Sequence, residues 1–467
     1  MTRLETGFAV AVVAVLLVSV TAPFVVAAPA DDGSDAFDLD ETNAYEPPSV
    51  PEESTATVDG QTFSDAQRAV DATDPGDTVV LEGRFEERLT VNTTGVTVRA
   101  SEAGAVVDGG GEGDVVVVAA ENVTVEGLLL RNSGYDAGSE DAGVFVEGTA
   151  NGTELRELYL SGITFGVWVD GADSVTVTDS RIEGREDVER RTDRGNGINL
   201  WETRNSTIRN TEITDVRDGI YYSWAKDVVA TNNTIWDSRY GVHYMYSNDN
   251  RLEDNLAVDN DVGYALMVSD GLTLVNNTAA RNDGTSGHGI LLKDIERSEI
   301  RGNVLLENGN GLYVYNAQDN RIAGNLLLRN AVGVHVTADS NGQEVVGNSF
   351  INNEDAVLTT TQNLIVWNGS DRGNYWSDAR AVDLDGDGTS EVRHRPAGLV
   401  EALVAERPQA RIFVDSPAFD AVRLAESSFP VVDSPGIVDR QPLADPPTRL
   451  EELCESQLTT SARSTAA

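Results

Sequence analysis

The chain has 467 residues, of which 77 are acidic and 34 basic, so its net charge near neutral pH is −43. A surface of this sign repels a polyanion, which excludes nucleic acid as a partner. Strong acidity often accompanies disorder, but here 40% of the residues are hydrophobic and they recur at regular spacing. We therefore expect a folded protein with an acidic surface, as halophilic archaea use to stay soluble in concentrated salt.

The first 30 residues are typical of a secretory signal. Arg3 precedes an apolar run over residues 8–20, and Ala-Pro-Ala at 28–30 offers a small-residue cleavage site. We expect an exported, extracytoplasmic protein whose signal is cleaved near Ala30. The apolar run is also long enough to remain as a membrane anchor, and this alternative stays open. Residues 31–58 are predicted to be an acidic, proline-containing linker.

A glycine followed by an aliphatic residue or a tyrosine recurs at a spacing of 22 residues, with one spacing of 26. These glycines are Gly197, Gly219, Gly241, Gly263, Gly289, Gly311 and Gly333. Each repeat alternates apolar and polar residues and is rich in β-branched side chains, which favours short strands. A unit this short cannot bury its own apolar face and must stack on its neighbours. The sequence therefore predicts an all-β fold, a right-handed parallel β-helix with one repeat per coil.

The segments outside the repeats are expected to close and extend the β-helix. Residues 63–73 have helical spacing and are predicted to cap its N-terminal end, within a β-helical domain of residues 59–378. Residues 379–445 are predicted to form a C-terminal extension with an acidic loop and two short helices. The polar tail, residues 446–467, is expected to be disordered.

Alternation along the repeats separates inward from outward positions. Two apolar columns are predicted to form the core: Ile198, Ile220, Val242, Tyr264, Ile290, Leu312 and Val334, and Leu200, Tyr222, Tyr244, Leu266, Leu292, Val314 and Val336. The residues between them are predicted to face outward: Asn199, Tyr221, His243, Ala265, Leu291, Tyr313 and His335. A further column is predicted to form a ladder of hydrogen-bonded side chains at a turn: Asn233, Asn255, Asn277, Asn303, Asn325 and Asn348.

The outward stripe is the strongest functional signal, because it carries aromatic, His and Met side chains where an acidic protein should carry carboxylates. His243 and Met245 lie two residues apart, and Met267 follows Met245 by one repeat. Thioether and imidazole ligands suit Cu(I), so these three residues are candidate copper ligands in an exposed, weak site. Methionine also suits an adaptable contact surface for a protein, and from the residues alone both interpretations stay open.

Other side chains of the stripe are predicted to bind a partner: Trp201, Tyr221, Leu291, Lys293, Tyr313 and Tyr315. His288 is offset along its strand and His335 lies four coils from His243, so neither is expected to complete the copper site.

The segment DLDGDGTSE has the order of a calcium-binding loop. Its candidate ligands are Asp383, Asp385, Asp387 and Glu391. An EF-hand would place a glutamate where His394 stands, so Glu391 is the expected closing ligand of a structural calcium ion. A solvated acidic turn is the alternative.

Parallel β-helices also include carbohydrate enzymes, which need clustered carboxylates beside a base. The outward stripe lacks such a cluster, so we predict no catalytic residues and no enzymatic activity. A secreted carbohydrate-binding or polysaccharide-modifying β-helix protein remains the alternative function.

Several runs within residues 75–440 resemble the NosD family of nitrous oxide reductase maturation proteins. They are GVHYMYSNDN, GYALMVSDGLTLVNN, GHGILLKDIERSEIRGN and GLYVYNAQDNRIAGN in the repeats, then GNYWSDARAVDLDGDGTSEVRHRP and SPAFDAVRLAESSFPVV beyond them. The tail segments and the H-Y-M-Y-S and L-L-K-D-I runs make the resemblance specific.

The resemblance implies an extracytoplasmic subunit attached to the permease and ATPase of an ABC transporter. It implies help in assembling the copper–sulfide centre of nitrous oxide reductase, with copper received from a lipoprotein chaperone. On this basis His243, Met245 and Met267 become copper-handling residues, and whether the cargo is copper or sulfur stays open. The chain itself would hydrolyse nothing, and it would associate with the membrane through its partners or an uncleaved anchor.

Overall fold

A computed structural model describes residues 47, 49–135, 138, 140–337, 339–361, 363–413, 416–428 and 435–447. The expected signal, most of the linker and the polar tail lie outside the described residues. Within the described part of the chain, no helix has the length and apolar character needed to cross a membrane.

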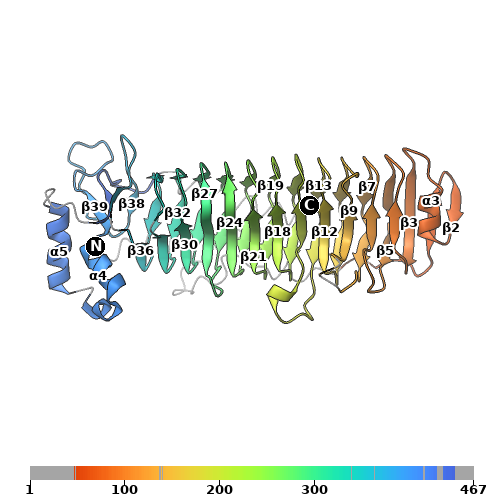
Figure 1. The fold of residues 1–467 in the computed structure, drawn as a ribbon, viewed down its shortest axis with the longest axis horizontal. Coiled ribbons are helices and arrows are strands. Elements are labelled where there is room, and N and C mark those ends of the chain that lie inside the picture. The colour runs from red at the N-terminus through yellow and green to blue at the C-terminus, as the bar shows by residue number, and fades with distance from the viewer. Residues whose placement is uncertain are drawn as a thin grey trace, which may run out of the picture. The chain divides into compact units, whose positions relative to one another are not determined.

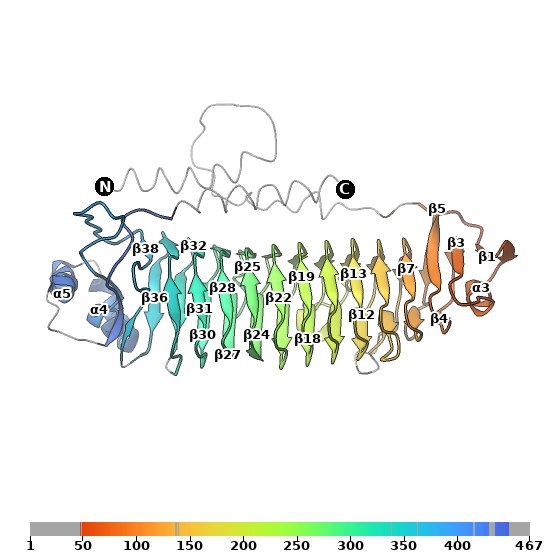
Figure 2. The same ribbon diagram turned by 90° about the horizontal axis from the view of Figure 1, so that it is seen from above.

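The chain divides into two compact units, Tyr45–Thr273 and Leu274–Ala467, with the division inside β25 (Thr273–Val275). Each unit is built from stacked coils of parallel strands (Figures 1 and 2). The chain is an all-β parallel β-solenoid of about 13 turns, with coils of about 23 residues and little helix. This confirms the fold class that the 22-residue period predicts.

In the first unit, one face of the solenoid is a parallel sheet that carries the outward stripe. Its strands, in order, are β4 (Leu89–Val91), β6 (Val116–Val118), β9 (Ala142–Val146), β12 (Phe165–Asp170), β15 (Ile198–Trp201), β18 (Asp218–Ser223), β21 (Tyr240–Met245) and β24 (Val262–Asp270). Neighbouring strands pair in register, so side chains one coil apart lie side by side at about 4.8 Å.

The remaining strands of the first unit form the other faces of its coils. They are β1 (Thr55–Val58), β2 (Gln61–Phe63), β3 (Thr78–Phe85), β5 (Thr97–Asp108), β7 (Thr124–Glu126), β8 (Leu129–Arg131), β10 (Glu154–Arg156), β11 (Tyr159–Ser161), β13 (Thr176–Thr178), β14 (Arg181–Glu183), β16 (Thr207–Arg209), β17 (Glu212–Thr214), β19 (Val229–Thr231), β20 (Thr234–Trp236), β22 (Arg251–Glu253) and β23 (Leu256–Val258).

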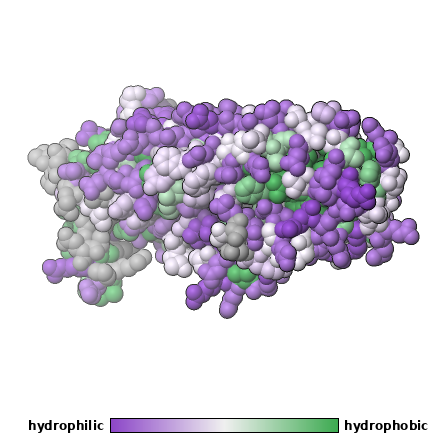
Figure 3. All heavy atoms as spheres, turned by 45° about the vertical axis from the view of Figure 1, so that its right-hand side comes forward, coloured by the Kyte–Doolittle hydropathy of each residue, from purple (hydrophilic) through white to green (hydrophobic). Residues whose placement is uncertain are grey.

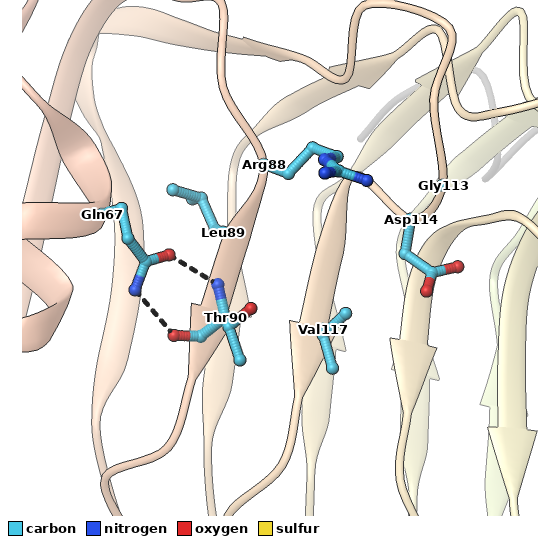
Figure 4. A pocket seen from close by; sticks show the side chains of 7 residues that line it. All are labelled: Gln67, Arg88, Leu89, Thr90, Gly113, Asp114 and Val117. Atoms are coloured by element: carbon cyan, nitrogen blue, oxygen red, sulfur yellow. Dashed lines mark hydrogen bonds between the residues drawn. The ribbon is translucent and has the colours of Figure 1, made fainter.

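A short helix, α3 (Ala66–Asp71), covers the N-terminal end of the first unit and packs against β1 to β4. Its N-terminus is capped by Asp65, whose side chain accepts from the backbone N–H of Arg68 at 2.8 Å. The side chain of Gln67 pairs with both backbone groups of Thr90 on the edge strand β4, at 2.7 and 3.1 Å (Figure 4). The helix thus satisfies an edge that would otherwise be open, as the sequence predicts.

The second unit continues the same strand pattern and ends in helices. Its strands are β26 (Thr278–Ala280), β27 (His288–Glu296), β28 (Glu299–Arg301), β29 (Val304–Leu306), β30 (Asn310–Tyr315), β31 (Arg321–Ala323), β32 (Leu326–Leu328), β33 (Val332–Val336), β34 (Glu344–Val346), β35 (Ser349–Ile351), β36 (Asp355–Thr359), β37 (Leu364–Val366), β38 (Tyr375–Trp376), β39 (His394–Ala397) and β40 (Gly436–Asp439). Helices α4 (Leu399–Glu406) and α5 (Pro417–Ser428), joined through the 3₁₀ turn η2 (Pro408–Phe413), contact each other and β39.

The core follows the two apolar columns. Every member of both is buried, with at most 2% of its surface exposed. Tyr222 and Tyr244 stack inside the first unit with ring centroids 4.1 Å apart, so aromatic side chains also fit the column. The inward assignment is confirmed.

Buried asparagines form hydrogen bonds between successive coils at a turn. In the first unit the Asn255 side-chain oxygen accepts from the backbone and side-chain N–H groups of Asn233, at 3.0 and 2.9 Å. In the second unit the same bonds run from Asn303 to Asn325 and from Asn325 to Asn348. These contacts confirm the predicted ladder, which satisfies turn amides that the strands leave unpaired.

The substitution Val242→Asp is expected to lower the free energy of unfolding by at least about 3 kcal/mol, because it places an unpaired carboxyl group in the stacked core. The control is Asn248→Asp, an exposed position in the same coil, which should stay within about 0.5 kcal/mol of wild type. Thermal melts in concentrated salt measure both. Unchanged stability of Val242→Asp would contradict the inward assignment.

Candidate functional site

Two adjacent strands of the first unit, β21 and β24, hold the candidate copper ligands. Met245 ends β21 and is in register with Met267 on β24, so the two thioethers leave the same sheet face one coil apart. His243 lies two residues before Met245 and therefore projects from the same face. Both Met side chains are half-buried, so they remain accessible from outside.

His243 is held by a carboxylate that the sequence does not mark. Its Nδ1 lies 2.8 Å from Oδ2 of Asp218, the first residue of β18. Arg239 donates to both oxygens of the same carboxylate, from Nε at 2.9 Å and from Nη2 at 2.6 Å. The Asp218 side chain has no exposed surface. Burial raises the pKa of Asp218, but the bonds from His243 and Arg239 outweigh it and lower the pKa overall.

Aromatic rings complete the surroundings of His243. The ring of Tyr221, one coil away in register, lies 4.9 Å from the imidazole, and the ring of Tyr240 lies 5.0 Å from it, edge to face. The Arg239 guanidinium lies 4.3 Å from the centre of the Tyr240 ring. The register partner on the other side, Ala265, is small.

These contacts correct one expectation. The sequence predicts an exposed site, but His243 is only 8% exposed, and Asn199 and Ala265 on the same outward column are buried as well. The accessible part of the site is therefore its methionine side.

A charged insertion borders this region. It contains a 3₁₀ turn, η1 (Arg191–Asp193), and Arg191 forms ion pairs with Asp237 at 3.2 Å and Asp261 at 3.0 Å. Arg194 pairs with Asp215 at 3.1 Å. These ion pairs connect the insertion to the turns that precede β18, β21 and β24.

The predicted partner-binding residues divide between the two units. In the first, Trp201 is exposed and Tyr221 is half-buried against His243. In the second, Lys293 and Tyr315 are exposed and Tyr313 is half-buried. Leu291 is only 8% exposed, with Tyr313 as its register partner, so it offers little surface to a partner.

In the second unit, His288 and His335 both contact the ring of Tyr313. The His288 ring stacks on Tyr313 with centroids 4.6 Å apart, and His335 contacts the same ring edge to face at 4.8 Å. The Asn310 side-chain amide lies 3.1 Å from the His288 Nδ1. Burial, with a contribution from nearby His335, lowers the pKa of His288 to about 4, so this ring stays neutral at pH 7.

The acidic loop brings three of its four predicted ligands together. Asp383, Asp385 and Glu391 each offer an oxygen, and these atoms lie within 4.8 Å of one another. Asp387 is not part of this group, and its side chain accepts from the backbone N–H and the hydroxyl of Thr389. A calcium ion in this loop stays a prediction.

Two exposed aromatic residues beside the site escape the sequence patterns. Trp224 and Tyr246 follow β18 and β21, stack with centroids 4.9 Å apart, and are 56% and 44% exposed. Both have a left-handed backbone, with φ of 57° and 54°, which bulky side chains rarely adopt. Their position in the repeat is the signal that could have identified them. It is the turn residue after the strand, and Glu202 occupies it in the preceding coil.

Hydrophilic side chains cover most of the face shown in Figure 3, and hydrophobic ones gather in a band on it. A cavity of about 570 Å³ lies at the N-terminal end of the first unit, beside Arg88 and Asp114 (Figure 4). Burial and the nearby Asp141 and Glu140 raise the pKa of Asp114 despite a bond from the Ala142 N–H. This cavity lies several strands away from β21 along the same sheet.

Comparisons with known proteins identify the family. The family model described as periplasmic copper-binding protein (NosD) matches residues 178–381. A probable ABC transporter binding protein NosD of Pseudomonas aeruginosa is 38% identical over 356 residues, which cover 73% of this chain and 82% of the relative. The protein of the same description from Stutzerimonas stutzeri is 34% identical over 375 residues, covering 77% and 85%. Among solved structures, the Dettilon tailspike protein matches 61% of this chain and 62% of its own with 14% identity and a TM-score of 0.47. The identity to the two NosD proteins, over most of both chains, shows that this chain belongs to the NosD family.

Proposed function

We propose that this chain is an extracytoplasmic accessory subunit of an ABC transporter and helps to deliver copper to the copper–sulfide centre of nitrous oxide reductase. Its relatives are named as probable ABC transporter binding proteins, and its family is described as periplasmic and copper-binding. The observation that carries the proposal is the placement of Met245 beside Met267, with His243 on the same strand face.

The chemistry of this donor set fits Cu(I) as a cargo. Cu(I) accepts sites of few ligands made of thioether and imidazole, whereas zinc prefers thiolate, imidazole and carboxylate. The carboxylate that contacts His243, that of Asp218, already accepts hydrogen bonds from Arg239 and is paired with His243. Half-buried methionines leave one side open, which suits an ion that must pass from a copper chaperone to the reductase.

The same carboxylate supports a non-enzymatic role. Glycoside cleavage uses two carboxyl groups that face the bond to be broken. Asp218 is buried and paired, and its partners are a guanidinium and an imidazole rather than a second acid. In the proposed complex, the ATPase of the transporter supplies the energy.

For the transporter contact we propose helices α4 and α5. Leu399 and Leu403 on α4 are 44% and 39% exposed, and Val422 on α5 is also exposed. Val400, by contrast, is buried against the rest of the second unit. An amphipathic helix pair with this much exposed apolar surface, on an otherwise acidic protein, fits an apolar surface of the permease.

Replacing Met245 and Met267 by leucine should weaken Cu(I) binding about tenfold or more, which corresponds to about 1.4 kcal/mol or more, because apolar bulk is kept and both sulfur ligands are lost. A competition titration with a chromogenic Cu(I) chelator measures the affinity. The control Trp201→Leu removes an aromatic contact from the same face and should bind as wild type does. Equal affinities of the double variant and the wild type would refute copper binding by the methionine pair.

Replacing Leu399 and Leu403 by glutamate should reduce recovery of the permease with the tagged chain several-fold, because two charges enter an apolar contact. Both side chains are exposed, so the stability of the isolated chain should change by less than about 1 kcal/mol. Leu384→Glu, at an exposed position in the acidic loop, is the matched control. Unchanged recovery of the complex with the double variant would exclude this docking surface.

A further inference from the structure

The carboxylate of Asp218 fixes which nitrogen of His243 carries the proton. Asp218 is completely buried and receives two bonds from the Arg239 guanidinium, whose position is held in turn by the Tyr240 ring. A carboxylate in such a pair is ionised and can only accept hydrogen bonds. The His243 Nδ1, 2.8 Å from Oδ2, must therefore be the donor.

A neutral imidazole that donates from Nδ1 keeps a free lone pair on Nε2. In this structure the Nε2 of His243 is buried, and no described residue forms a hydrogen bond with it. A buried nitrogen without a hydrogen-bond partner costs free energy, and coordination to a metal ion would offset that cost. The ring projects from the sheet face that also carries Met245.

From this geometry we infer that Asp218, anchored by Arg239, is a positioning residue: it holds His243 in the Nδ1–H tautomer and so presents Nε2 as the nitrogen ligand for Cu(I). The inference rests on the proposed function, because it assigns the ligand atom and the residue that prepares it. Asp218 itself does not touch the metal. Carboxylates behind a histidine ligand orient the ring and raise its basicity in metal sites of other proteins.

The test combines a tautomer measurement with a binding measurement. Nitrogen-15 chemical shifts assign the protonated nitrogen of His243, and the chain has only four histidines to resolve. We expect Nδ1–H in the wild type. In Asp218→Asn, one carboxamide oxygen must replace two acceptors for Arg239 and His243, so the Nε2–H tautomer should become populated. Cu(I) affinity of this variant, from the same chelator competition, should fall about 10- to 100-fold.

The control is Asp439→Asn in the second unit. Asp439 is another fully buried carboxylate, and it accepts from Trp376 and from the backbone of Asn374. This variant should lose stability but keep the His243 tautomer and the Cu(I) affinity of wild type. A merely structural role of Asp218 would give the same pattern as the control.

The outcomes separate the two claims. An Nε2–H tautomer in the wild type overturns the inference without any variant, even if Asp218→Asn does not fold. Equal Cu(I) affinities of wild type and Asp218→Asn, with weaker binding by the double methionine variant, overturn the inference and leave the proposed function standing. Equal affinities of wild type and the double methionine variant overturn the proposed function.

Discussion

Register between successive coils is the constraint on which the rest of the structure depends. A β-strand cannot satisfy its own backbone groups, so the strands of each coil pair with those of the next coil. The asparagine ladders fix that register, because one side-chain oxygen accepts from the backbone and the side chain of the coil before it. A slip by one residue would move the core column to the surface and break every step of the ladder.

The same register creates the candidate site. Met245 and Met267 are 22 residues apart in sequence but neighbours in space, since both occupy the same position of adjacent coils. Tyr221 and His243 are brought together in the same way. A rigid sheet therefore presents donor atoms from separate repeats at a fixed spacing, which suits capture of a small ion without a large conformational change.

The surroundings of the site contain a buried carboxylate and two bulky residues with a left-handed backbone. Trp224 and Tyr246 hold a left-handed backbone, which costs a bulky residue about 1–2 kcal/mol. Asp218 is fully buried, and only its partners keep it ionised. The left-handed turn recurs in other coils, as at Glu202 and Val268, so it belongs to the fold, whereas the buried Asp218 pair lies at the candidate site.

Most of the fold could be predicted from the period of the sequence, because a 22-residue repeat with alternating apolar residues leaves few other arrangements. The inward columns, the asparagine ladder and the pairing of Met245 with Met267 all follow from the spacing of the repeats. The Asp218 and Arg239 pair could not be predicted, since polar residues at strand starts usually face solvent. The burial of His243 depends on rings from two coils, which periodicity does not describe. Likewise Asp439 bonds to Asn374 from 65 residues away, outside any repeat.

The central claim is that this β-solenoid binds Cu(I) through two thioethers and one imidazole on a single sheet face. X-ray absorption at the copper edge of the Cu(I)-loaded wild-type chain tests it most directly, because sulfur and nitrogen neighbours scatter differently. The account predicts a shell of sulfur neighbours together with one histidine nitrogen, and loss of the sulfur shell in the variant with leucine at both methionine positions. A copper environment of nitrogen and oxygen alone in the wild type would contradict it.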